Sequence, residues 1–235
     1  MSSSPDTTSA TIKTPGASAW TEDFSTLPDG PFTASPHFAE VQGNAEISGG
    51  VLTLTPTPGG SGNPAGGSAM LGALVDSKGK HCQMYGRVDV VMKTATWEPG
   101  IVNSFVLYSE DRSEIDFHLV GKNDRSVFTE FCNRGEIEYN SGAYCPTDHA
   151  ASAGYHTYSI SVTEQEIMWQ VDGNPIRIEK KSVRGDRFPS GPFRVRIGSW
   201  CGHDRASLEW AGGDPDPARG PFITYVKSVR YTPTS

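Results

Sequence analysis

The chain has 235 residues, a formal net charge of −7 and 20% charged residues. This acidic balance argues against nucleic acid or an anionic membrane as a partner, because either would need a basic surface patch. No apolar run approaches the length that spans a membrane. The 26 Gly and 17 Pro residues favour short strands joined by tight turns, and the length suits one large β-sandwich.

The beginning of the chain is rich in Ser, Thr, Pro and Ala. We therefore expect residues 1–18 to form a flexible segment ahead of a single domain at residues 19–235. The first residues lack the basic start and apolar stretch of a secretory signal. This predicts a cytoplasmic protein if the N-terminus is native, and a secreted protein if a signal peptide was trimmed.

Short β-type runs separated by turn residues follow from Trp20 onward. Residues 56–67 have the Gly, Pro, Ser and Asn content of a loop, and the segment Asp172-Gly173-Asn174 predicts a hairpin turn. No helical periodicity is visible, so we predict an all-β fold, a two-sheet antiparallel β-sandwich of the jelly-roll type. The predicted strands include residues 51–55, 87–93, 101–108, 160–162, 167–171, 175–178, 193–197 and 222–229.

One predicted strand carries three ionisable side chains on the same face. Strand side chains alternate between the two faces of a sheet, so Glu114, Asp116 and His118 project together while Ile115 and Phe117 enter the core. Such a cluster is costly on an otherwise apolar strand, and it therefore indicates a functional site.

This strand resembles the E-x-D-x-E strand of glycoside hydrolase family 16, a concanavalin A-like jelly-roll family. The resemblance implies that Glu114 is the nucleophile, that Asp116 assists it, and that His118 stands in place of the acid/base Glu. The W-x-V-D-G pattern at 169–173 agrees with this family. More narrowly, residues 197–200, 208–213 and 220–222 resemble the fungal Crh-type cell-wall transglycosylases.

The same resemblance indicates the substrate contacts. Where Crh-type enzymes have T-N-Y-F-G-K-G, this chain has T-E-F-C-N-R-G, with Glu130 in place of an amide and Phe131 in place of a Tyr. Trp200 is retained and is expected in the cleft, whereas Trp169 and Trp210 are expected in the core. The predicted substrate-binding residues are Trp200, Phe131, Glu130, Arg134 and Cys201.

No cofactor and no metal site are expected. The spacing of His81, His149 and His156 does not suggest metal ligation, and the four cysteines match no zinc or redox motif. We expect reduced thiols, with a disulfide between Cys132 and Cys145 as the alternative.

Three functions remain open. Loss of polar sugar contacts beside a retained aromatic wall favours a non-hydrolytic enzyme that acts on a small, largely apolar fungal natural-product intermediate. Cyclisation, isomerisation or Diels–Alder-type ring closure needs shape, a proton donor and exclusion of water. The alternative is a Crh-type β-glucan or chitin glycosidase or transglycosylase with Glu114 as nucleophile. The third hypothesis is a non-catalytic carbohydrate-binding module. The expected partner is a small-molecule substrate, or a glycan in the alternative.

Overall fold

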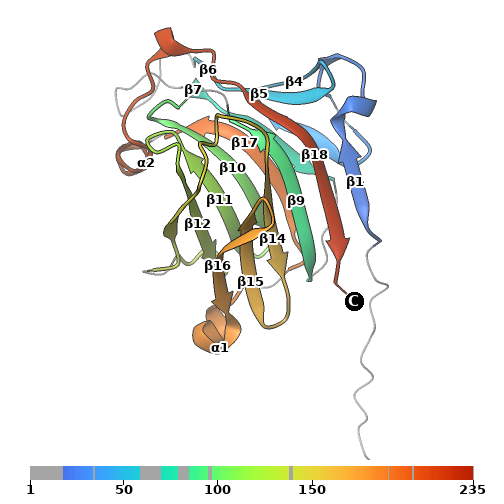
Figure 1. Cartoon of the computed structure of the whole chain (residues 1–235), viewed down its shortest axis with the longest axis vertical. Coiled ribbons are helices and arrows are strands. Elements are labelled where there is room, and N and C mark those ends of the chain that lie inside the picture. Colours follow the sequence, from blue (N-terminus) through green and yellow to red (C-terminus); the bar gives the residue numbers. More distant parts are fainter. Residues whose placement is uncertain are drawn as a thin grey trace, which may run out of the picture.

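Two antiparallel sheets face each other in the computed structural model (Figure 1), which describes residues 18–33, 35–58, 70–78, 85–94, 97–137, 140–189, 191–202 and 204–234. Within these residues one sheet has nine strands and the other has seven. None of the described helices is long and apolar enough to cross a membrane. The predicted flexible segment up to residue 17, most of the predicted loop at 56–67, and Cys82 lie outside the described residues.

The nine-stranded sheet consists, in spatial order, of β16 (Asn174–Lys180), β15 (Glu166–Val171), β14 (His156–Val162), β9 (Gly86–Lys93), β18 (Thr224–Pro233), β5 (Val51–Thr55), β4 (Asn44–Ser48) and β2 (Gly30–Pro31), with β1 (Trp20–Asp23) paired to β18. The seven-stranded sheet consists of β13 (Ala143–Pro146), β12 (Ser126–Cys132), β11 (Glu114–Val120), β10 (Ile101–Tyr108), β17 (Arg194–Cys201), β8 (Ala73–Ser77) and β3 (Phe38–Gln42). A short pair, β6 (Thr57–Pro58) and β7 (Met70–Leu71), completes the strands of the described residues.

The prediction of an all-β, two-sheet antiparallel sandwich is confirmed. The predicted hairpin joins β15 to β16, and its turn residues Asp172 and Gly173 have φ angles of 50° and 80°. Positive φ at both central residues is the geometry of the type I′ turn that Asp-Gly favours.

Two short helices are not predicted by the sequence pattern. They are α1 (Lys181–Arg184) and α2 (Arg205–Ala211). A capping box begins α2, in which the Asp204 side chain accepts from the Ser207 amide, and Gly212 ends it at φ 100°. Because α2 has only seven residues, it is too short to show an apolar periodicity in the sequence.

The core fills the space between the two sheets. Phe117 of β11 lies 6.1 Å from the Phe105 ring of β10 and meets Tyr158 of β14 edge-on at 5.7 Å. Ile115 and Leu119 point the same way and are buried in the same cluster. Strand alternation therefore places Glu114, Asp116, His118 and Val120 on the outer face of the seven-stranded sheet.

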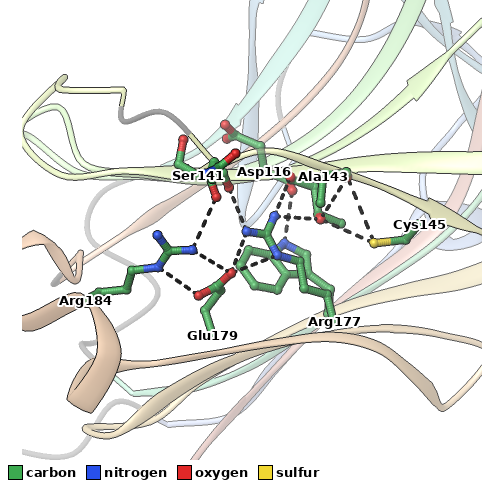
Figure 2. A network of polar contacts seen from close by, with 10 residues as sticks. Asp116, Ser141, Ala143, Cys145, Arg177, Glu179 and Arg184 are labelled. Carbon is green, nitrogen blue, oxygen red and sulfur yellow. Dashed lines mark hydrogen bonds and ion pairs between the residues drawn. The ribbon is translucent and has the colours of Figure 1, made fainter.

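A polar network joins the two sheets at the edge where β16 lies (Figure 2). Arg177 of β16 donates to the carbonyl oxygens of Thr129 at 2.7 Å and Ser141 at 2.8 Å, and to Glu179 at 2.7 Å. Burial alone would raise the pKa of Glu179, but hydrogen bonds from Arg184 and Arg177 outweigh it and lower that pKa. Figure 2 shows these charged groups gathered below the chain that carries Ser141 and Ala143.

Arg177→Met is expected to lower the free energy of unfolding by about 2–4 kcal/mol, because two carbonyls and a partly buried carboxylate lose a charged donor. The measurement is urea unfolding near neutral pH. The matched control is Arg205→Met, since Arg205 is 90% exposed in its pair with Glu209 and should change stability by no more than about 0.5 kcal/mol. Equal effects of the two substitutions would contradict a structural role for the network.

Candidate active site

Glu114, Asp116 and His118 lie in a row along the outer face of β11, as the strand alternation predicts. Asp116 is only 4% exposed, and the other two side chains are partly buried. The back of this strand is anchored, because the Trp169 indole N–H of β15 donates to the Asp116 carbonyl at 3.0 Å. The backbone that carries these three side chains is therefore held in place by the opposite sheet.

Glu130 joins this row from the neighbouring strand. The register of β11 and β12 places Glu130 directly opposite Asp116, on the same outer face. Burial, and then the charge of Asp116, raise the pKa of Glu130. The same two causes, in the same order, raise the pKa of Glu114. Two glutamates that resist ionisation beside a buried aspartate form a site suited to proton transfer.

His118 has one ring nitrogen near Asp116 and one without a partner. Its Nε2 lies 3.7 Å from Asp116 Oδ2, which is longer than a hydrogen bond. His118 Nδ1 and Asp116 Oδ1 are both buried without a hydrogen-bond partner. Buried polar atoms are usually satisfied, so these two are available to a ligand.

Aromatic rings enclose His118 on several sides. The imidazole centroid lies 6.2 Å from Phe128, 6.2 Å from Trp200 and 5.5 Å from Trp210. Trp200 and Trp210 are stacked at 6.1 Å with 16° between their planes, and Trp200 Nε1 donates to Ser104 Oγ at 3.3 Å. These rings pack over a small apolar cluster on the outer face, and α2 supplies Trp210 to it.

A fixed cation from β17 also acts on Glu114. Arg196 of β17 donates to Asp76 at 2.7 and 2.9 Å, and Tyr108 donates to the same carboxylate at 2.7 Å. The positive charge of Arg196 acts on Glu114 in the direction that lowers its pKa, although burial and Asp116 prevail. Arg196 and Asp116 therefore have opposite electrostatic effects on the pKa of Glu114.

The predicted substrate-binding residues divide between the two faces of the sheet. Trp200 and Glu130 lie on the outer face with the row on β11. Phe131 does not: it is 2% exposed, pairs with Ile115 and packs on Trp169 in the core. That prediction was wrong, because alternation along β12 turns Phe131 inward when Glu130 faces outward.

Cys201 is also placed away from the row, and Arg134 lies in the turn after β12. Cys201 follows Trp200 on β17 and is therefore turned inward, where it packs with Ile101 and Phe222. The prediction that it contacts substrate was wrong for the same reason as that of Phe131. Arg134 is exposed in the turn after β12, at φ 55°, with its amide donating to Ser113 Oγ.

Sequence reasoning missed two aromatic residues of the site. Trp210 was expected in the core, but it lies against His118. Phe128 is two residues before Glu130 on β12, so strand alternation could have placed it on the outer face. Nothing in the local sequence could have placed Trp210, because its position depends on how α2 folds back over the sheet.

Cys132 and Cys145 are free thiols, so the alternative of a disulfide between them is not realised. Cys132 is opposite Glu114 on the outer face, whereas Cys145 belongs to the core. Burial, followed by the charges of Glu114 and Asp116, raises the pKa of Cys132 to about 11. Cys132 is therefore a poor nucleophile near neutral pH.

The row also has the composition of a cation site. Asp116, His118 and Glu130 each present one ligand atom within 4.8 Å of the others. Two carboxylates and one imidazole could hold a divalent ion, or they could exchange a proton among themselves. Both uses are compatible with the unpartnered Asp116 Oδ1 and His118 Nδ1.

Glutamate and aspartate side chains gathered on the outer face of one sheet of a β-sandwich suit a carbohydrate-active protein, because glycosidases use carboxyl groups in catalysis. The sequence model of "Glycosyl hydrolases family 16" matches residues 38–214, and the chain belongs to this family. The prediction of this family is confirmed, including its similarity to Crh-type proteins.

Individual relatives agree. Crh-like protein 4 of Aspergillus fumigatus is 40% identical over 152 residues, which cover 62% of this chain and 33% of that protein. The structure titled "Apo Crh5 transglycosylase" matches with a TM-score of 0.77 and 30% identity over 94% of this chain and 86% of that one. "Crh5 transglycosylase in complex with NAG" matches with a TM-score of 0.78 and 29% identity over the same shares. The matched regions span 33–38% of the length of the first curated relatives.

Proposed function

We propose that this chain is a β-glycan glycosidase or transglycosylase in which Glu114 is the nucleophile and His118 is the acid/base. The observation that carries the proposal is the shared outer face of β11 and β12, where Glu114, Asp116 and His118 meet Glu130. The chain that carries this arrangement belongs to family 16, which is a family of glycosyl hydrolases.

The residues can supply the two steps of a retaining reaction. Such a reaction needs a carboxylate that attacks the sugar and a group that first donates and later accepts a proton. Glu114 offers the carboxylate, and Arg196 opposes the effect of burial on its ionisation. His118 offers the proton, while the Asp116 and Glu130 carboxyls, within 4.8 Å, can orient the imidazole and exchange a proton with it.

The relatives suggest the substrate class. One similar protein is described as a transglycosylase and was solved with NAG. In this chain Trp200 and Trp210 provide flat apolar faces next to His118, on which a sugar ring can stack. We propose a β-glucan or chitin-type oligosaccharide as the substrate. Such an enzyme would have to be exported to reach a cell-wall polymer.

A second candidate rests on the enclosure of His118. Three aromatic rings within 6.2 Å surround the imidazole, and no polar group among the described residues hydrogen-bonds its Nδ1. A small apolar molecule held there could be cyclised or isomerised with His118 as the proton donor. In that case Glu114 would accept a hydrogen bond and would not attack, and export would be unnecessary.

Product analysis and covalent trapping distinguish the two candidates. The protein is incubated with chitin and β-1,3-glucan oligosaccharides, and transfer and hydrolysis products are separated by size. In parallel it is treated with activated 2-deoxy-2-fluoro glycosides, which slow breakdown of a glycosyl–enzyme intermediate. We expect oligosaccharide products and an ester on Glu114 by peptide mass spectrometry. Neither product nor adduct with any of these glycans would reject the first candidate.

The pH dependence should reveal the coupling between the two glutamates. The negative charge of Glu130 contributes to the raised pKa of Glu114. Glu114 must be ionised to attack, so activity falls as pH drops through its pKa. Glu130→Gln removes that charge and is expected to shift the acidic limb of the kcat/KM profile to lower pH. An unchanged acidic limb, measured on the same oligosaccharide, would mean that another group controls it.

A further inference from the structure

A second cluster of ionisable side chains lies outside the row on β11. It consists of His149 in the connection from β13 to β14, His156 at the start of β14, and Asp172 in the turn between β15 and β16. Each offers one ligand atom within 4.8 Å of the others. The function proposed above uses none of these residues.

The carboxylate of this cluster is held in a fixed orientation. Asp172 Oδ1 accepts from the Thr157 amide at 2.8 Å, and the Asp172 amide donates to the Thr157 carbonyl at 2.9 Å. The other oxygen, Oδ2, is turned toward the imidazoles. It lies 2.8 Å from His156 Nδ1 and 3.9 Å from His149 Nε2.

The two imidazoles are stacked, with ring centroids 3.4 Å apart and 15° between the planes. The loop that carries His149 is anchored, because Thr147 Oγ1 donates to the His149 carbonyl at 2.8 Å and the Ala151 amide donates to the Asp124 carbonyl. The Nε2 atoms of His149 and His156 are both buried without a hydrogen-bond partner. The ion pair between His156 and Asp172 does not involve His149, so it does not explain why His149 Nε2 is buried without a hydrogen bond.

We infer that His149, His156 and Asp172 form a binding site for one divalent transition-metal ion of the Zn²⁺ type. Zinc lies about 2.0–2.2 Å from imidazole nitrogen and carboxylate oxygen, so two tetrahedral ligands are roughly 3.3–3.5 Å apart. The observed separations from Asp172 Oδ2 of 2.8 and 3.9 Å fall on either side of that value. A side-chain adjustment of about 0.5 Å would make both fit.

The donor set selects the kind of metal. Two of the three donors are imidazoles, which suit Zn²⁺, Ni²⁺ and Cu²⁺, whereas Ca²⁺ and Mg²⁺ prefer an all-oxygen shell. Three protein ligands leave a fourth position for water or another ligand.

The ion would link parts of the fold that are distant in sequence. It would join the loop that leaves the seven-stranded sheet to a turn of the nine-stranded sheet. Because such a site cannot form in the unfolded chain, binding adds to the stability of the folded state.

The test is calorimetric titration of EDTA-treated, tag-free protein with ZnCl₂ near neutral pH, followed by thermal unfolding with and without zinc. We expect one ion per chain. At zinc about 100-fold above Kd, the melting temperature should rise by roughly 5–10 °C. No binding up to about 1 mM zinc, or no stabilisation by it, would overturn the inference.

Variants locate the ion. His149→Gln and Asp172→Asn should each weaken zinc binding by about 100-fold or more, since loss of even an outer-shell partner costs 10- to 100-fold. His37→Gln is the matched control and should bind zinc normally. His118→Gln tests the other candidate set on β11: loss of zinc binding there, with His149→Gln unaffected, would assign the ion to that row and contradict the inference. Far-ultraviolet circular dichroism of the metal-free proteins checks folding, and Asp172→Asn answers the question alone if His149→Gln does not fold.

Discussion

Glu114→Gln is expected to lower kcat/KM on the β-glycan substrate by about 10⁴- to 10⁶-fold, the loss typical for removal of an essential nucleophile. Glutamine has nearly the same shape as glutamate, so the outer face of β11 should keep its packing. An amide cannot form the glycosyl ester, and covalent trapping should disappear together with turnover. The rate is measured by following oligosaccharide products, and the ester by mass spectrometry.

The controls separate chemistry from folding. Glu209→Gln makes the same substitution at an exposed position of α2 and should leave kcat/KM within about twofold. The melting temperature of Glu114→Gln should not fall, because burial raises the pKa of Glu114 and the ionised carboxylate therefore costs stability near neutral pH. Glycan turnover that survives this substitution would show that Glu114 is not the nucleophile.

His118→Ala is expected to lower kcat/KM on unactivated glycans by about 10²- to 10⁴-fold, the usual contribution of a general acid. The loss should be much smaller on an aryl glycoside with an acidic phenol as leaving group, because such a group departs without a proton. His118→Glu places a carboxylic acid at the same position and should retain more activity than His118→Ala. The measurement is kcat/KM for both substrate types in both variants.

Comparing unactivated glycans with the aryl glycoside distinguishes proton donation by His118 from a contribution of His118 to substrate binding. His118 packs against Phe128, Trp200 and Trp210, so an alanine there could also disturb binding. A binding defect would reduce activity on both substrates to a similar degree, whereas loss of an acid would spare the activated one. Equal losses would therefore argue against proton donation by His118.

Much of the fold followed from local pattern. The predicted strands at 51–55 and 101–108 coincide with β5 and β10, because each is a run of β-type residues bounded by turn signals. The Asp172-Gly173 turn was predictable because few sequences tolerate positive φ at two successive positions. The helix α2 was not predictable, since two turns give no periodic signal.

The sequence alone determined the row of side chains on β11, because alternation along one strand is a local property. Glu114, Asp116 and His118 had to share a face whatever else the chain did, and the resemblance to family 16 supplied their expected roles. Alternation should also have excluded Phe131 and Cys201 from the cleft, since each adjoins a residue that faces outward. Consecutive residues of the family motif face opposite sides of the sheet, so only alternate ones can reach the cleft.

Only the tertiary structure decided which other groups meet this row and which form the second cluster. The register between β11 and β12 brings Glu130 opposite Asp116, and the packing of α2 brings Trp210 onto His118. His149, His156 and Asp172 are separated in sequence by connections whose path depends on how the two sheets close over one core. Register and sheet closure arise from side-chain packing between distant segments, and local spacing carries no information about either.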